Sequence, residues 1–361
     1  MKIIAFYLPQ FHPTKDNDTW WGDGFTEWTN VAKAKPLFHN HYQPKIPSTL
    51  GFYDLRLPEV RERQAQLASE AGISAFCYYH YWFGDGKQEL ELPFNEVVKL
   101  GTPDFPFCLC WANESWSRKF WDKGGAVNND KSTYLIEQKY LGQDDNISHF
   151  NSLLKAFKDK RYMQIDNKLV FVIYKPFDFI EVGSFMKQWN DLAIKNGFAG
   201  FYFIAYSLDV EKEYGPLTSI GFQAVCSCRL NREMKKNFKW FLRKGISILF
   251  HTPRRCSYKS IFHKFIGEEE SRYCNVFPTI IPNWDHTPRS GINGDLYTNC
   301  TPALFKRHVK DVFLHIQNKP ENMQICFLKS WNEWGEGNYM EPDLKYGKGF
   351  INALRDCLSK Q

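Results

Sequence analysis

The sequence predicts an α/β fold, a (β/α)8 barrel of the TIM type with long loops after its strands and a basic insertion. Helical patterns lie between many of its strand-like runs, and this alternation is typical of βαβ units. Polar and aromatic residues follow directly after several runs, at the strand ends where barrel enzymes carry their active sites. Eight short apolar runs have strand character, at residues 3–8, 73–79, 105–111, 169–174, 200–206, 222–226, 276–282 and 324–330.

Several of these runs are nearly continuous in Val, Ile, Phe and Tyr, as expected for parallel strands that are buried on both faces. Helices are predicted at 58–71, which ends before Gly72 as a C-cap, and at 147–157, 185–196 and 302–317. A doubly wound sheet is the alternative, but no Gly-x-Gly-x-x-Gly follows the first run, which argues against dinucleotide binding. We expect one barrel domain over 1–361, with the basic insertion at about 229–272.

Composition narrows the protein class only in part. The net charge of +6 does not by itself indicate a nucleic-acid partner, and the 17% of aromatic residues can either fill a large core or line a sugar cleft. The ten cysteines include no Cys-x-x-Cys and most lie in apolar runs, which favours free buried thiols in a reducing compartment. No signal-peptide core or membrane-length apolar stretch is visible. We therefore expect a cytoplasmic protein, with a position at the inner membrane as a further option.

The segment 229–264 is strongly basic. It contains eleven Lys and Arg residues opposed only by Glu233, with aromatic and aliphatic residues interleaved. Two interpretations stay open: a solvated insertion, or a surface for anionic lipid head groups or an anionic glycan. No nucleic-acid-binding motif accompanies the charge, so we expect no nucleic-acid partner.

The strongest catalytic candidates are Glu333 and Glu336, in the stretch 331–337 (WNEWGEG) after the last predicted strand. Glycosidic bonds are usually cleaved by two carboxyl groups, one protonated and one ionised. Two carboxylates held close together cannot both ionise easily, so one pKa should rise. The flanking Trp331 and Trp334 could stack on sugar and exclude water. The alternative is that both glutamates merely cap or decorate the last helix.

A second carboxylate candidate is Glu114, which follows the third strand in 110–114 (CWANE). We predict it as a reserve catalytic residue or substrate contact, with a structural hydrogen-bonding role as the alternative. No metal-ligand pattern or serine-hydrolase constellation is recognisable, so neither a metal nor another cofactor is expected. The other predicted substrate-binding residues are Tyr7, Gln10, His12, Glu27, Trp28, Tyr79, His80, Trp111, Asn113, Trp116, Tyr206, Asn283, Trp284, Asp285, Asn332, Trp334 and Glu341.

The chain resembles the WbsX-like family of bacterial glycan-cluster proteins over nearly its whole length. The motifs that carry the resemblance are 5–13 (AFYLPQFHP), 20–31 (WWGDGFTEWTNV), 76–83 (FCYYHYWF), 110–114 (CWANE) and 331–337 (WNEWGEG). That family is similar to the endo-α-mannosidase glycoside hydrolases, which are (β/α)8 barrels with a Glu-Trp-x-Glu-Gly motif. The resemblance implies Glu333 as the base on the sugar 2-hydroxyl, Glu336 as the general acid, and a 1,2-anhydro sugar intermediate with net retention. Gly335 departs from the bulkier residue that the mannosidases tend to have.

Three functions follow from this sequence. The first is a retaining glycoside hydrolase that acts on an α-manno- or α-rhamno-configured bacterial polysaccharide of the O-antigen or capsule type. The second is a glycosyltransferase of polysaccharide biosynthesis, although no Asp-x-Asp or Rossmann fingerprint is present for a nucleotide sugar. The third is a non-catalytic glycan-binding protein. All three have an oligosaccharide or polysaccharide partner, and contact with an anionic membrane through 229–264 is compatible with each of them.

Overall fold

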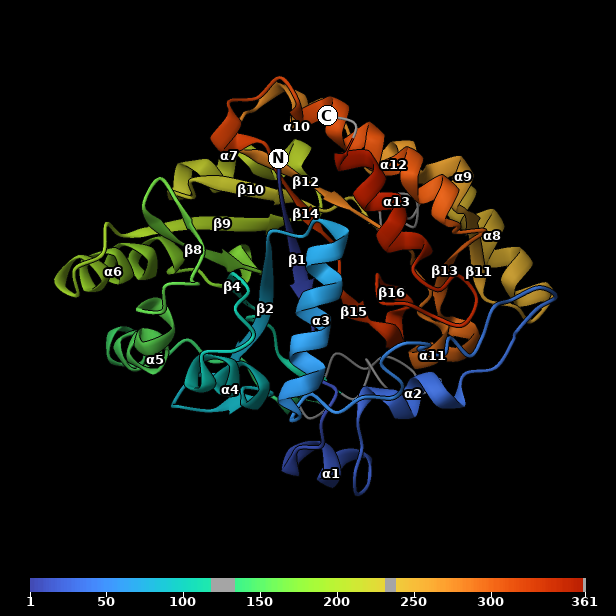
Figure 1. The fold of residues 1–361 in the computed structure, drawn as a ribbon, viewed down its shortest axis with the longest axis horizontal. Helices are drawn as coiled ribbons and strands as arrows, with labels where there is room; N and C mark the ends of the chain where they lie inside the picture. Colours follow the sequence, from blue (N-terminus) through green and yellow to red (C-terminus); the bar gives the residue numbers. More distant parts are fainter. Residues whose placement is uncertain (118–133, 231–237, 360–361) are drawn as a thin grey trace.

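A computed structural model describes residues 1–117, 134–230 and 238–359 of the chain. Eight parallel strands form a closed barrel in the order β1-β14-β12-β10-β9-β8-β4-β2, and β2 pairs with β1 to complete the ring (Figure 1). This is the predicted fold class. The strands are β1 (Lys2–Tyr7), β2 (Ala75–Trp82), β4 (Phe107–Trp111), β8 (Lys168–Ile173), β9 (Phe201–Ser207), β10 (Ala224–Ser227), β12 (Val276–Ile280) and β14 (Ile325–Leu328).

All eight predicted strands are confirmed, with ends that shift by a few residues. The predicted helix 58–71 is α3 (Pro58–Ala71), and Gly72 ends it in the left-handed region with φ of 85°. A side chain would be strained in this conformation, which is why glycine suits the helix end. The other three predicted helices are α5 (Gln143–Phe157), α6 (Val182–Lys195) and α12 (Pro302–Ile316).

The remaining elements include further helices beside the barrel and short elements in the loops. The other helices are α1 (Lys15–Trp21), α2 (Glu27–Lys33), α4 (Leu92–Leu100), α7 (Val210–Ile220), α11 (Thr287–Ser290) and α13 (Gly349–Leu358). Short strands lie outside the ring: β3 (Gln88–Glu89), β5 (Trp116–Ser117), β6 (Tyr134–Ile136), β7 (Gln164–Ile165), β13 (Asp295–Thr298), β15 (Asn332–Glu333) and β16 (Asn338–Tyr339). Strands β15 and β16 form the antiparallel pair that carries the predicted catalytic motif.

Aromatic side chains fill much of the interior. Four rings from different strands meet inside the barrel: Phe6 stacks on Tyr79 at 5.4 Å, and Tyr174 lies 4.6 Å from Tyr206. Phe6 also meets Tyr206 edge-on at 5.8 Å. Outside the barrel, Trp189 is fully buried among the helices. The high aromatic content therefore serves mainly as core. All ten cysteines are free thiols, and Cys274 alone among them is exposed.

The basic segment lies between β10 and β12 and has its own short elements: α8 (Phe238–Leu249), β11 (Arg254–Ser257), α9 (Tyr258–Ile261) and α10 (Glu269–Arg272). Arg229 opens the segment but is buried, and its guanidinium pairs with Glu211, Glu269 and Glu270 at 2.7–2.8 Å. It therefore belongs to the core and cannot contribute to a basic surface. In the described parts of the chain, no helix combines the length and apolar character that a membrane span requires.

Candidate active site

The predicted catalytic motif forms a tight turn at the carboxyl end of the barrel. Glu333 ends β15, and Glu336 ends the 3-10 turn Trp334–Glu336 before Gly337 reverses the chain with φ of 57°. The turn is anchored from below because the Asn332 amide accepts a hydrogen bond from the Leu8 N–H at 2.8 Å and donates to the Leu8 carbonyl at 3.0 Å. Both glutamates are thereby held over the barrel mouth on a rigid support.

Glu333 is buried, with 5% of its surface exposed. The loss of hydration raises its pKa to about 8, although Lys329 opposes this rise and lies 3.5 Å from the carboxylate. The neighbouring Glu336 raises the pKa further, since two adjacent carboxylates repel. Glu333 consequently carries a proton at neutral pH in the free protein.

Glu336 has the opposite electrostatic environment. Burial raises its pKa, but Arg289, His286, Lys329 and a hydrogen bond with Glu333 together outweigh burial and hold the pKa below its usual value. The Arg289 guanidinium donates to Glu336 through Nη1, and its Nε and Nη2 donate to both oxygens of Glu27 at 3.0 and 2.9 Å. His286 lies 3.8 Å from the same Glu336 oxygen. Glu336 is therefore ionised in the free protein.

The pair thus offers one protonated and one ionised carboxyl group, as cleavage of a glycosidic bond requires. The protonation state is nevertheless the reverse of the one that the resemblance implies for its base and acid. A base at Glu333 must first lose its proton, and an acid at Glu336 must gain one. Each of the two side chains influences the pKa of the other, so their protonation states are linked.

Several further predicted residues border the pair. The Tyr79 hydroxyl accepts a hydrogen bond from Lys329 at 3.2 Å, and Tyr206 lies in the ring layer below. Glu114 is one-third exposed and 3.8 Å from Lys175. Burial raises the pKa of Glu114, and the charge of Glu336 adds to this effect. Tyr79, Tyr206, Glu114 and Glu27 are therefore the predicted residues that the fold brings to Glu333 and Glu336.

Four predicted substrate contacts point away from the barrel mouth. The Tyr7 hydroxyl donates to Gln64 of α3 at 2.7 Å, and His80 pairs with His149 of α5 at 2.8 Å. The Trp111 ring lies on the same outer side, where its Nε1 donates to the Trp82 carbonyl. These residues lie one position from inward-facing neighbours, so strand alternation turns them outward. The interpretation as sugar contacts does not fit this packing, nor does it fit Asn113, which bonds the Lys175 backbone.

The aromatic residues of the motif are also structural. Trp331 and Trp334 have no exposed surface, so the expectation that they stack on sugar is wrong. Trp334 stacks on Tyr339 at 3.7 Å and donates its Nε1 to Glu341 at 2.6 Å. Glu341 also accepts from Tyr53 and Gln64, so its carboxylate is occupied beneath the turn. Asn332 has the anchoring role already described.

The remaining predicted residues lie in the long segment after β1, which includes α2, and in β5. Gln10 and His12 are buried, and burial lowers the pKa of His12 to about 4. Trp28 donates its Nε1 to the Tyr53 carbonyl at 2.7 Å and lies 5.7 Å from Trp334. Trp116 is half-buried against Tyr81 at 5.1 Å. Contact of these four residues with substrate stays a prediction.

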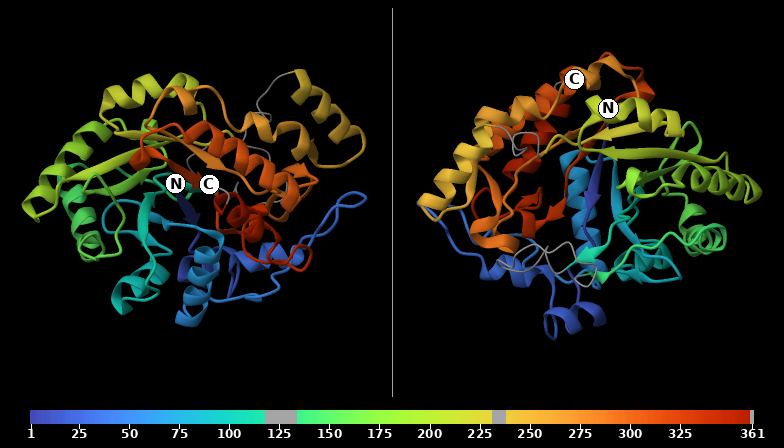
Figure 2. Two further views of the ribbon diagram at one scale, coloured as in Figure 1. Left: turned by 45° about the horizontal axis from the view of Figure 1, so that its top comes forward. Right: turned by 180° about the vertical axis from the view of Figure 1, so that it is seen from behind.

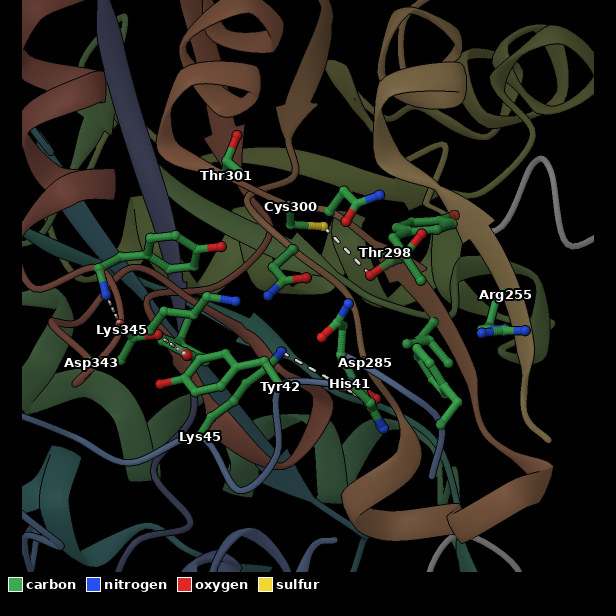
Figure 3. Close-up of a pocket in the computed structure, with 18 of the residues that line it drawn as sticks. His41, Tyr42, Lys45, Arg255, Asp285, Thr298, Cys300, Thr301, Asp343 and Lys345 are labelled. Atoms are coloured by element: carbon green, nitrogen blue, oxygen red, sulfur yellow. Dashed lines mark hydrogen bonds and ion pairs between the residues drawn. The ribbon is translucent and has the colours of Figure 1, made fainter. Parts of the chain in front are cut away.

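Three predicted residues after β12 lie beside a separate cavity. The cavity has a volume of about 530 Å³, and Figure 3 shows Arg255 and Lys345 on opposite sides of it. Asn283 and Asp285 line it, and Trp284, between them in sequence, stacks on His286 at 5.7 Å. The Asp285 carboxylate accepts from His41 at 2.9 Å and Gln43 at 2.7 Å, and the charge of Lys45, 3.9 Å away, is the strongest of the influences that hold its pKa at about 2 despite burial. Its N–H donates to the Glu336 carbonyl at 2.7 Å, so Asp285 fixes the catalytic turn from behind.

Sequence reasoning missed three residues that shape the site. Arg289 and His286 follow the predicted seventh strand, and Lys329 lies within the predicted eighth. A lysine inside an otherwise apolar strand, four residues before Glu333, was a usable signal. Nothing local marked Arg289, because its partner Glu27 is 262 residues away. Across the described residues, no three His, Cys, Asp or Glu side chains converge in a way that could hold a metal ion.

The closed parallel barrel, with Glu333 and Glu336 at the carboxyl ends of its strands, is a (β/α)8 fold, and in this class of fold active sites lie at that end. The chain belongs to the family described as Glycosyltransferase WbsX, which it matches over residues 3–354. It is 33% identical over 359 residues to protein WxcX of Xanthomonas campestris pv. campestris, in strains ATCC 33913 and B100. The match covers 99% of this chain and 50% of the relative, so the chain spans about half the length of these relatives.

Solved structures give the fold relationship. The GH99 endo-α-mannosidase from Bacteroides thetaiotaomicron superposes with a TM-score of 0.57 at 12% identity, covering 99% of this chain and 96% of the other. A glycoside hydrolase-like protein superposes with a TM-score of 0.61 at 14% identity, covering 99% and 93%. These likenesses confirm the barrel and the predicted similarity in fold to the endo-α-mannosidases.

Proposed function

We propose that the protein is a retaining glycoside hydrolase that cleaves an α-manno- or α-rhamno-configured bacterial polysaccharide of the O-antigen or capsule type. The observation that carries this proposal is the Glu333–Glu336 pair at the carboxyl end of the barrel, in which the pKa of buried Glu333 is raised and that of partly exposed Glu336 is lowered. Because Glu333 and Glu336 are three residues apart on one turn, both carboxyl groups can reach adjacent atoms of one sugar ring. The axial 2-hydroxyl of manno- and rhamno-configured sugars is the group that such a pair can use.

In the proposed reaction, Glu333 takes the proton of the sugar 2-hydroxyl while the 2-oxygen of the sugar attacks the anomeric carbon. The glycosidic bond breaks, Glu336 gives its proton to the departing oxygen, and a 1,2-anhydro sugar forms. Water then opens this ring at the anomeric carbon; Glu336 takes a proton from the water and Glu333 returns one to the 2-oxygen. Two inversions give net retention. The cycle requires substrate to loosen Arg289 from Glu336, so that the proton can move from Glu333 to Glu336 before cleavage.

Two variants and two substrates test this assignment. Glu333→Gln and Glu336→Gln should each abolish cleavage of the polysaccharide while the fold stays intact, and full activity in either variant would refute the proposal. A glycosyl fluoride needs little acid assistance. It should restore turnover to Glu336→Gln but not to Glu333→Gln. Rescue of Glu333→Gln instead would assign the acid to Glu333, as the free-state protonation favours.

The family description favours a second candidate, a glycosyltransferase in O-antigen or capsular polysaccharide biosynthesis. Binding of a nucleoside diphosphate would stabilise the folded state by mass action. A clear rise of the melting temperature with UDP or GDP would favour the transferase. A non-catalytic glycan-binding protein is the third candidate, and it predicts sugar affinity that survives loss of both glutamates and no turnover of any tested glycan.

We also propose one barrel domain over 1–361 with the insertion at about 229–272, and a cytoplasmic location beside the inner membrane. The basic charge of 229–264 supports peripheral contact with anionic lipid, while Arg229 is excluded from that contact by its buried ion pairs.

A further inference from the structure

Helix α8 has an exposed apolar face. Of the nineteen large apolar side chains that are exposed in the described residues, seven lie between 238 and 250. Phe238, Ile248 and Leu249 are each at least 70% exposed. Single exposed apolar residues are common on protein surfaces, but a cluster of this density marks an interaction site. Figure 2 shows α8 at the outer edge of the molecule, away from the barrel strands.

The helix is amphipathic with its apolar side outward. At about 100° per residue, Phe238, Phe241, Leu242, Ile246, Ile248 and Leu249 fall within an arc of about 160°. Trp240 lies on the opposite side and is buried, with the Arg254 guanidinium 5.1 Å from its ring centre. The Ser247 hydroxyl donates to the Thr252 carbonyl at 2.5 Å. The Trp240 side of the helix therefore packs against the rest of the protein, and the apolar arc faces outward.

The segment that carries this face is basic in sequence, and Arg254 within it pairs with Asp295 at 2.6 Å. From Met234 to Gly267 the sequence contains nine Lys and Arg residues and no Asp or Glu. Lys244 lies at the border of the apolar arc, 5.0 Å from the Trp240 ring, and is exposed, as are Arg255 and Lys259 beyond the helix. Helices with an apolar arc bordered by cations bind in the head-group region of anionic bilayers.

The size of the face separates a bilayer from a second copy of the chain. A helix of 12 residues is about 18 Å long and about 10 Å wide, so its footprint is about 180 Å². A stable protein interface buries about 800 Å² on each partner. The apolar face alone is far too small for that, whereas an interfacial helix needs only to sink its apolar arc about 5–10 Å into the lipid.

We propose that α8 docks this chain on an anionic membrane surface, with Phe241 and Ile248 among the residues that enter the lipid and Lys244 and Lys259 near the head groups. The docking is independent of the glycosidase assignment, because neither face of α8 includes Glu333 or Glu336. It would hold the enzyme beside membrane-linked glycan. Cleavage of a soluble substrate should accordingly be the same in α8 variants and in the wild type.

Vesicle co-sedimentation of the full chain tests this proposal. Phosphatidylcholine vesicles with about one-third phosphatidylglycerol should bind the protein at least tenfold more tightly than pure phosphatidylcholine vesicles. Binding should weaken when salt rises from about 0.1 M to about 0.5 M. The double variant Phe241→Ser/Ile248→Ser should lose at least tenfold in partitioning. The matched control is Ile180→Ser/Ile194→Ser, which replaces two exposed residues near α6 and should bind as the wild type does.

A charge variant separates the electrostatic part. Lys244→Gln/Lys259→Gln should weaken binding to anionic vesicles by about tenfold. Lys187→Gln/Lys195→Gln, on the exposed side of α6, is its control and should have little effect. Equal binding to neutral vesicles, or unchanged binding by the apolar variant, would overturn the proposal. So would self-association of the wild type in sedimentation velocity that Phe241→Ser/Ile248→Ser abolishes, since α8 would then face a second copy.

Discussion

Replacing Arg289 by glutamine tests the ion pair that joins the first long loop to the catalytic turn. The Arg289 guanidinium bonds both oxygens of Glu27, which has no exposed surface, and it also bonds Glu336. Glutamine removes the positive charge but keeps most of the volume. Glu27 is then left as a buried carboxylate without its bidentate partner, which is the costly way to break an ion pair.

The expected loss follows from the burial of this pair. Removing one partner of a buried pair costs about 3–5 kcal/mol. An unfolding entropy of about 2.1 cal/mol/K per residue gives about 0.76 kcal/mol/K for 361 residues, so the melting temperature should fall by about 4–7 °C. Loss of Arg289 should also raise the pKa of Glu336, since this cation is the largest of the influences that lower it.

Urea unfolding followed by circular dichroism measures the change. Arg56→Gln is the matched control, because Arg56 makes the same two-oxygen contact with Asp54 at the surface, where the side chains are 52% and 30% exposed. That exposed pair should contribute no more than about 1 kcal/mol. The double variant Arg289→Gln/Glu27→Gln should recover part of the loss, because it removes both charges. An equal effect of Arg289→Gln and Arg56→Gln would refute the reasoning.

Three further predictions concern the same turn. Between about pH 5 and 8 the folded protein keeps the Glu333 proton that the unfolded chain has lost. Rising pH should therefore destabilise the wild type relative to Glu333→Gln by about 1.4 kcal/mol per pH unit. A difference in urea unfolding that does not change with pH would contradict this. Gly335→Ala should displace Glu27, whose Cδ would lie 2.6 Å from the new methyl carbon, and should lower both stability and cleavage; wild-type values would show that the loop yields easily. Glu341→Leu should destabilise the protein by about 2 kcal/mol or more, because it leaves the buried Trp334 N–H and its other donors unpaired; a change below about 0.5 kcal/mol would argue against this.

The position of the glutamate pair could be read from local pattern. Glu333 and Glu336 follow a short apolar run, and eight such runs separated by helical patterns predict the barrel. For the residues near each strand end, it was harder to predict whether the side chain points into the barrel or outward. Tyr79 and His80 are adjacent in sequence and similar in character, yet Lys329 contacts the first inside the barrel and His149 contacts the second outside it.

The sequence alone determined the class of fold, the eight strands and the segment that holds the carboxyl pair, because apolar periodicity and strand-end chemistry are local properties of the chain. The tertiary structure decided which side chains face the barrel mouth, because closure of the barrel fixes which alternate residues of each strand point inward. It also decided the protonation of the pair. The pKa of Glu336 depends on Arg289, which the closed barrel brings from another strand end, and burial of Glu333 depends on the whole mouth. Charge and burial of this kind arise from contacts between distant segments, and no local pattern encodes them.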